Sequence, residues 1–320
     1  MLESHTSNAL PTFHNEVQGN IILGIVRTLE FDQVSNFLLT LHKTGYTGTV
    51  GFFCDDISQD SLHKFSAMGI YKENFKEVRI SIPFTGKKIN AYRLFSPVLR
   101  SYFYITSPKS QQTFAKNYFH IHQSRHFLYT AFIEHHGADY KNIMLSDTRD
   151  VIFQKDPFDF TIDDSLHCFL EDKATTISSE PHNSSWILRG FGKDILDTIG
   201  NNTISCAGIT IGSTQAIHTY TSLMCSILLS PKVRNIAGIT GLDQGIHNYA
   251  IRMGLLDSVL SLHENENGPV LTMGLMHKDQ INTNQSGHII NKDGSIVHTL
   301  HQYDRHPSLL EAFPQFLLHS

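Results

Sequence analysis

Apolar and polar positions follow two different rhythms along the first part of the chain. Short apolar runs of strand length occupy residues 20–26, 49–54 and 78–83. Between them, residues 31–43 carry apolar side chains three and four positions apart, and residues 61–68 form a shorter helical segment. Strand, helix, strand, helix, strand is the order of βαβ units. The pattern therefore predicts an α/β fold with a Rossmann-type, mostly parallel sheet that binds ligands at the carboxyl ends of its strands.

The second part of the chain continues the pattern with longer irregular stretches. Residues 262–296 are rich in Asn, Gly and His, which predicts irregular loop with short strands. Strands are expected at 140–145, 166–170 and 204–211, and helices at 118–136, 214–229 and 243–253. We expect residues 1–17 to be a disordered leader and 18–320 to be one domain. Its nucleotide-binding half is about 18–150 and its elaborated acceptor half about 151–320.

Composition and charge argue against several classes of protein. The chain has 320 residues, with 25 Lys and Arg against 30 Asp and Glu, so its net charge of −5 argues against a general nucleic-acid binder. The four cysteines include no CxxC pair, which argues against a structural zinc site. No window approaches the roughly 18 apolar residues of a transmembrane segment, and the start lacks a signal peptide. A cytoplasmic location is expected.

The clearest group of candidate functional side chains directly follows the strand expected at 140–145. The segment from Ser146 to Asp150 places two carboxylates, Asp147 and Asp150, three positions apart in a turn. Carboxylate oxygens suit Mn²⁺ or Mg²⁺, which commonly bind one or two carboxylates together with substrate phosphates. An ordinary Asp-rich turn with an Asp–Arg surface pair is the alternative.

The segment from Ser146 to Phe158, SDTRDVIFQKDPF, resembles the region around the metal motif of GT-A-fold glycosyltransferases of the broad galactosyltransferase and glycogenin type. Other landmarks resemble that family in the expected order over residues 18–306. Two features depart from the family: the pair is Asp-x-x-Asp rather than Asp-x-Asp, and Cys206 stands where Asn is common.

The resemblance implies roles for residues outside the turn. The strand at 20–26 resembles the first nucleotide-binding strand, residues 205–213 the donor-sugar segment, and residues 297–306 the late segment whose His closes the metal shell. The residues so implied are Val26 and Arg27 for the nucleotide, Cys206, Ala207 and Gly208 for the donor sugar, Asp243 and Gln244 near the acceptor as catalytic residues, and Asp147, Asp150 and His301 for the metal.

Four residues are also weighed on physical grounds. At 100° per residue, Arg125 lies beside the apolar stripe of its helix, and a buried guanidinium needs an anion, such as a diphosphate or Asp147 and Asp150. Its alternative is a stem that reaches the surface. Asp55 and Asp56 end a strand where a carboxylate can accept from a nucleoside, or they cap a helix. Asp243 could likewise be only a helix cap.

The resemblance and the residues together predict a metal-dependent glycosyltransferase of the hexosyltransferase type. It would use Mn²⁺ or Mg²⁺ and a nucleotide-diphosphate sugar, with UDP as the expected carrier, and a glycan, lipid or protein acceptor. Two alternatives remain open: an aspartate-based phosphohydrolase, and a non-catalytic protein that binds nucleotide sugars or glycans.

Overall fold

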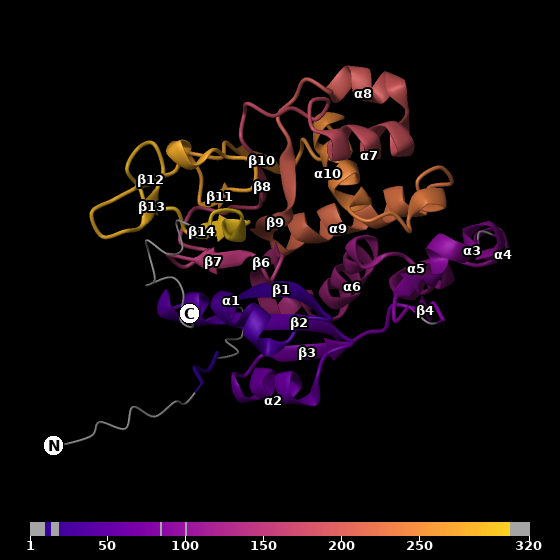
Figure 1. Cartoon of the computed structure of the whole chain (residues 1–320), viewed down its shortest axis with the longest axis horizontal. Helices are drawn as coiled ribbons and strands as arrows, with labels where there is room; N and C mark the ends of the chain where they lie inside the picture. The colour runs from indigo at the N-terminus through magenta and orange to yellow at the C-terminus, as the bar shows by residue number, and fades with distance from the viewer. Residues whose placement is uncertain (1–9, 14–18, 84, 100, 308–320) are drawn as a thin grey trace.

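A computed structural model describes residues 10–13, 19–83, 85–99 and 101–307 of the chain. It is a mixed α/β structure around a central seven-stranded sheet (Figure 1). The strand order is β10 (Leu260–His263), β8 (Leu166–Leu170), β9 (Ser205–Ser213), β6 (Tyr140–Ser146), β1 (Gly19–Arg27), β2 (Thr49–Asp55) and β3 (Tyr71–Asn74). Every neighbouring pair is parallel except those made by β9, which runs antiparallel to β6 and β8.

Alternating side chains of the central strands pack into two different cores. In β1, Ile21 and Leu23 face one core, while Ile22 faces the other, as the two-residue repeat of a strand requires. Helices cover both faces, which explains why β2 is buried along its whole length. The first core is closed by α5 (Pro108–Tyr118), α6 (Ile121–His136), α9 (Thr214–Leu229) and α10 (Leu242–Arg252), and the second by α1 (Phe31–Lys43) and α2 (Gln59–Ala67).

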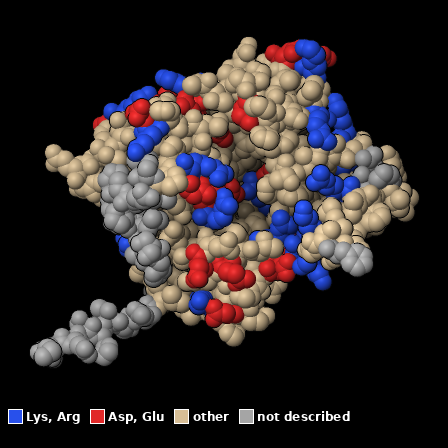
Figure 2. Space-filling model, viewed as in Figure 1, with Lys and Arg blue, Asp and Glu red and all other residues tan. Residues whose placement is uncertain are grey.

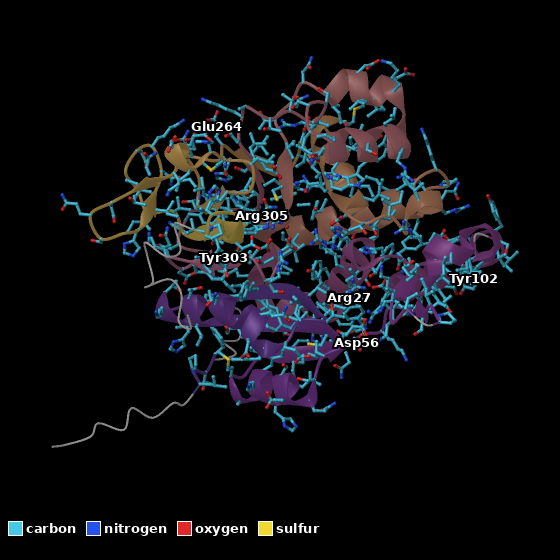
Figure 3. All side chains as sticks on the ribbon, in the orientation of Figure 1. Arg27, Asp56, Tyr102, Glu264, Tyr303 and Arg305 are labelled. Atoms are coloured by element: carbon cyan, nitrogen blue, oxygen red, sulfur yellow. The ribbon has the colours of Figure 1, made fainter. Side chains whose placement is uncertain are left out.

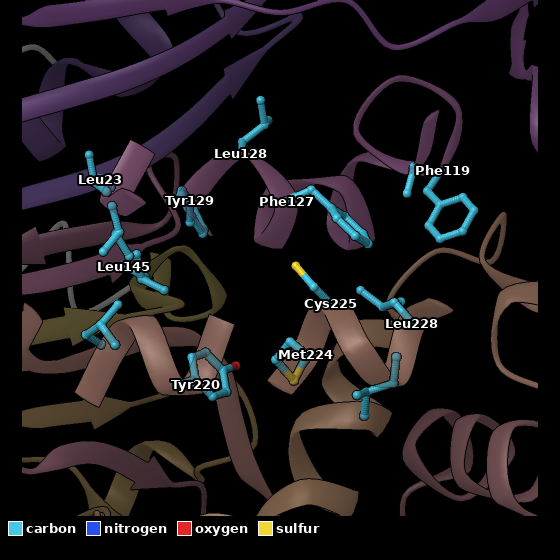
Figure 4. Close-up of a cluster of buried hydrophobic side chains, with 14 of the residues drawn as sticks. Leu23, Phe119, Phe127, Leu128, Tyr129, Leu145, Tyr220, Met224, Cys225 and Leu228 are labelled. Carbon is cyan, nitrogen blue, oxygen red and sulfur yellow. The ribbon is translucent and has the colours of Figure 1, made fainter. Parts of the chain in front are cut away.

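Helices α6 and α9 face each other across the first core (Figure 4). Phe127 and Tyr129 of α6 point towards α9, which contributes Tyr220 and Met224, and all four side chains are buried. The packing fixes the N-terminal half of α6 beside the ends of β6 and β9.

A second, small sheet lies beside the carboxyl end of β6. Its order is β11 (Val270–Thr272), β14 (Thr299–His301) and β7 (Val151–Phe153). Strand β7 follows the turn after β6 directly, and its antiparallel register pairs Val151 with His301. A histidine far along the chain is thereby held next to the turn that contains Asp147 and Asp150.

The other elements are short. They are the strand pairs β4 (Arg79–Ser81) with β5 (Lys88–Asn90) and β12 (Asn282–Thr283) with β13 (Ile289–Ile290), the helices α3 (Ala91–Leu99), α4 (Tyr102–Ile105), α7 (Pro181–Phe191) and α8 (Lys193–Ile199), and the single turns η1 (Gly137–Asp139), η2 (Arg234–Ile236), η3 (Lys278–Gln280) and η4 (Tyr303–Arg305). Among the described residues, no helix is both long and apolar enough to span a bilayer.

The mostly parallel α/β architecture is confirmed, but the expected third strand is wrong. Part of the apolar run at 78–83 forms β4, which pairs with β5 outside the central sheet. The strand beside β2 is instead β3, with the polar sequence Tyr-Lys-Glu-Asn. A strand at the edge of a sheet is only half-covered, so it needs no apolar run and leaves none to detect.

The helix expected at 118–136 is α6, which begins at Ile121, and Tyr118 is instead the last residue of α5. Phe119 and His120 have extended backbone between α5 and α6, and Phe119 is fully buried in the first core. Apolar spacing continues across the break, so periodicity cannot reveal it.

Most of the expected leader, 1–9 and 14–18, lies outside the described residues. Within 10–13, Phe13 is buried against His42 and Tyr46, and its backbone N–H donates to the carbonyl of Met68. This short piece is therefore packed against the domain.

The full burial of Leu128 in the first core predicts a large effect of its truncation. Replacing it with alanine leaves a cavity in a fully buried site, so Leu128→Ala should lower the free energy of unfolding by about 2–5 kcal/mol. Leu255→Ala, at a side chain that is 46% exposed, should change it by less than about 0.5 kcal/mol. Urea unfolding measures both, and equal losses would contradict the assigned core.

Candidate functional site

The turn after β6 is attached to two neighbouring strands. The backbone N–H of Asp147 donates to the carbonyl of Gly208 at 2.8 Å, and the Thr148 hydroxyl donates to the carbonyl of Ile25 at 2.9 Å. The turn therefore sits at the carboxyl end of β1 and β6, where an open α/β sheet binds ligands.

Three possible metal ligands meet at this turn. Asp147, Asp150 and His301 each offer an atom, and these atoms lie within 4.8 Å of one another. His301 is 1% exposed, and its Nε2 lies 3.6 Å from an oxygen of Asp147, which is too long for a hydrogen bond. This buried nitrogen has no hydrogen-bond partner among the described residues. Its Nδ1 lies 3.5 Å from the Cys206 sulfur, which fixes the ring.

The space between these side chains depends on a glycine. A Cβ built on Gly208 would lie 2.4 Å from Cε1 of His301, 2.7 Å from its Nε2 and 2.9 Å from an oxygen of Asp147. Two carboxylates and an imidazole nitrogen without a partner form a donor set that suits Mn²⁺ or Mg²⁺. The residues present therefore fit a divalent cation.

The charges of the three groups are coupled. Burial opposes ionisation of Asp147, but His301 and Arg125 together hold its pKa well below the ordinary value. Burial and the charge of Asp147 raise the pKa of Asp150. Burial also disfavours charged His301, yet Cys206, Asp147 and Asp150 hold its pKa well above the ordinary value. A proton on His301 thus balances the carboxylates, and a divalent cation would compete with that proton.

Arg125 joins the turn to β9 and α10. Its guanidinium is 11% exposed and donates to Asp147 at 2.8 Å, to Asp243 at 2.5 Å and to the carbonyl of Ala207 at 3.1 Å. The expected position beside the apolar stripe holds, and the alternative of a stem that reaches the surface is wrong. The anions it needs are supplied by the protein itself, chiefly by Asp243, which is 3% exposed.

Gln244 supports the backbone at the start of β9. Its amide accepts from the N–H of Ala207 at 2.7 Å and donates to the carbonyl of Ser205 at 2.7 Å. The register between β8 and β9 shifts between Cys206 and Thr210, which leaves the backbone N–H of Ala207 unpaired with β8 and free for the bond to Gln244. Both ends of the amide are occupied, so Gln244 is a positioning residue in this structure.

Asp243 lines a cavity beside Arg125 and is not the N-cap of its helix. The residue at the N-cap of α10 is Gly241, and Asp243 lies in the first turn with its carboxylate on Arg125. His122 lies nearby, with Nδ1 3.9 Å from the second oxygen of Asp243. The cap alternative for Asp243 is wrong.

The residues expected at the nucleotide are not all brought together. The Val26 side chain is fully buried in the second core, and Arg27 pairs with Glu77 while its side chain lines the cleft. Asp55 and Asp56 pair with Arg79 at 3.3 and 3.0 Å and do not line the cleft. They cap no helix either, since the N-cap of α2 is Ser58. Figure 3 places Arg27 and Asp56 at the ends of β1 and β2.

Two cavities of about 420 Å³ each meet at this site. Both are lined by His122, Arg125 and Asp147. The first continues past Arg27 and Asp150, and the second continues past Trp186 and Asp243. The surface is hollowed near its centre, beside a group of acidic and basic side chains (Figure 2). Arg305 also lines the second cavity and is labelled in Figure 3.

The sequence argument missed Glu171 and His122. Glu171 directly follows β8, lies in the second cavity and is buried, which raises the pKa of its carboxyl. Because β8 runs parallel to β6, its carboxyl end lies at the same edge, so the rule that located Asp147 could have found Glu171. No sequence signal distinguishes His122 from the other histidines.

Comparison with known proteins gives a coarse match of fold. Neither a protein-family model nor a curated protein matches the sequence. Among solved structures, the chain is similar to the crystal structure of the glycosyltransferase GlyE in Streptococcus pneumoniae TIGR4, at 13% sequence identity and a TM-score of 0.44. The match covers 96% of this chain and 61% of that chain. A likeness of this degree is limited to the overall arrangement of the fold.

Proposed function

We propose that this protein is a metal-dependent glycosyltransferase that uses a nucleotide-diphosphate sugar, with a UDP-sugar as the expected donor. The main support for the proposal is the cluster of Asp147, Asp150 and His301, which lies where two cavities meet. The cluster has room for a cation because Gly208, which lies against it, has no side chain. One cavity would take the nucleotide and the other the acceptor. A metal site between them is where a diphosphate leaving group would have to lie.

The protein side chains have separate tasks in this proposal. Asp147, Asp150 and His301 would hold Mn²⁺ or Mg²⁺, which as a Lewis acid stabilises the charge that develops on a departing diphosphate. Arg125 holds one oxygen of Asp147 and so leaves the other directed at His301. Gln244 fixes the backbone of Ala207, and with it the place of Gly208.

Asp243 is the carboxylate best placed for the acceptor. It faces the second cavity, one oxygen being held by Arg125 and the other lying 3.9 Å from His122. A carboxylate in such a position can accept a hydrogen bond from an acceptor hydroxyl and orient it towards the donor. Whether it also takes the proton depends on the stereochemistry of the reaction, which the product's anomeric configuration would reveal.

The proposal is tested by incubating the protein with UDP-sugars and Mn²⁺ and measuring the products. A glycosyltransferase releases UDP, with water as a slow acceptor when none is supplied. An aspartate-based phosphohydrolase would release inorganic phosphate, and a non-catalytic binder would release neither. Phosphate release, or binding without turnover over a panel of acceptors, would contradict the proposal.

Replacing His301 or His298, two histidines of the same segment, should affect metal binding differently. His301→Ala removes a ligand and should weaken Mn²⁺ binding by about 100-fold or more, measured from the free Mn²⁺ signal by electron paramagnetic resonance. His298→Ala is the matched control, because His298 is also buried but lies against Lys155, outside the ligand cluster. A larger loss in the His298 variant would show that the wrong histidine is assigned.

Gly208→Ala should abolish metal binding without removing any ligand. The added methyl group would contact the imidazole of His301 and the Asp147 carboxylate at less than 3.0 Å, so the ligands must move apart. Gly190→Ala is the control, since its Cβ would meet only Leu242, at 4.0 Å. Mn²⁺ titration and a melting curve of both variants check this expectation. Wild-type metal affinity in Gly208→Ala would argue against a cation at this position.

A further inference from the structure

Charge is distributed very unevenly along the chain. Residues 78–133 contain eight Lys and Arg and no Asp or Glu. That leaves 17 of the 25 basic residues, against all 30 acidic residues, for the rest of the sequence. A positive segment in an acidic protein points to an anionic partner.

The same segment carries the densest group of exposed apolar side chains. Five of the ten large apolar residues that are at least 36% exposed in the described chain lie between positions 94 and 105. They belong to α3 and α4, which project at one end of the molecule (Figure 1). These residues, here termed the α3–α4 surface, are Leu94 (46%), Phe95 (49%), Val98 (71%), Tyr104 (77%) and Ile105 (82%).

Basic side chains without acidic partners flank this surface. Lys87 precedes β5 and α3, Arg93 belongs to α3, and Lys109 follows α4; all three are exposed, and none forms an ion pair with a described carboxylate. Figure 2 shows Lys and Arg gathered on the side of the molecule where α3–α5 and β4 lie. Arg234, which is buried, lies behind the surface with its guanidinium 5.0 Å from the ring centre of Tyr104.

We propose that the α3–α4 surface docks the protein on an anionic lipid bilayer. Exposed aliphatic and aromatic side chains gain by entering the boundary between headgroups and acyl chains, while neighbouring Lys and Arg face the anionic headgroups. Nucleic acid would offer the basic residues a partner but would leave Val98 and Ile105 without one. A second copy of this chain would cover the apolar residues but would bring two positive surfaces together.

The surface adjoins the cleft. Tyr92 and Arg93 line a cavity of about 700 Å³ together with His182 and Trp186, and the last two also line the cavity that contains Asp243. A docked molecule would hold this larger cavity near the bilayer. On the function proposed above, which this step assumes, that placement favours an acceptor presented at the lipid surface.

Sedimentation of the full chain with vesicles tests docking without any sugar donor, so its outcome is independent of the proposed function. Vesicles of equimolar phosphatidylcholine and phosphatidylglycerol should carry the protein down, and vesicles of phosphatidylcholine alone should not. Replacing Val98 and Ile105 together with serine should weaken binding by more than about 10-fold. Replacing Lys87 and Lys109 together with glutamine should weaken it about 30-fold, at about 5-fold for each lysine.

Matched variants elsewhere on the molecule are the controls. Leu255→Ser with Leu262→Ser removes exposed apolar side chains, and Lys141→Gln with Lys278→Gln removes exposed charges; both pairs should bind like the wild type. Melting curves confirm that each variant is folded. Equal binding to both kinds of vesicle, or wild-type binding by both surface variants, would overturn the proposal. The proposal would also be overturned if the wild type were a dimer that does not bind vesicles. In that case, replacing Val98 and Ile105 would convert the dimer to a monomer.

Discussion

The arrangement of the site depends on one largely buried guanidinium. Arg125 extends from α6 and binds the Asp147 carboxylate, the Asp243 carboxylate and the Ala207 carbonyl. A charge in this position cannot be left unpaired, and removing one partner of such a group costs about 3–5 kcal/mol. The end of β6, the irregular part of β9 and the start of α10 are therefore held at fixed distances. Together with β14, which carries His301, these elements hold the candidate metal, donor and acceptor residues.

The irregularity of β9 makes this cluster possible. A regular strand would pair the backbone of Ala207 with β8. The shifted register frees its carbonyl for Arg125 and its N–H for the amide of Gln244. The carbonyl of the next residue, Gly208, faces β6 and accepts from the backbone of Asp147. Because Gly208 has no side chain, the space above it stays open to the metal ligands. The irregularity thus supplies the anchoring points of the candidate site, and the glycine supplies its room.

Charge divides the molecule into surfaces with different physical roles. Carboxylates gather in the cleft, where the proposed cation would neutralise them. The positive segment from 78 to 133 instead contributes Arg125 to the cleft, and Lys87, Arg93 and Lys109 to the exposed surface near α3 and α4. The proposed catalytic and membrane-docking roles thus both use basic side chains from this one stretch of chain.

The sequence by itself determined the elements whose apolar pattern is set by burial. Residues 31–43, 166–170 and 214–229 were delimited correctly, because a strand covered on both faces is a short apolar run and a helix packed on one face repeats apolar residues three and four positions apart. The turn with Asp147 and Asp150 was also located, since it directly follows such a strand. Only the tertiary structure decided the edge strand and the pairing of His301 with the turn. It alone assigned Asp55 and Asp56 to Arg79 instead of the cleft, because contacts between distant segments leave no period in the sequence.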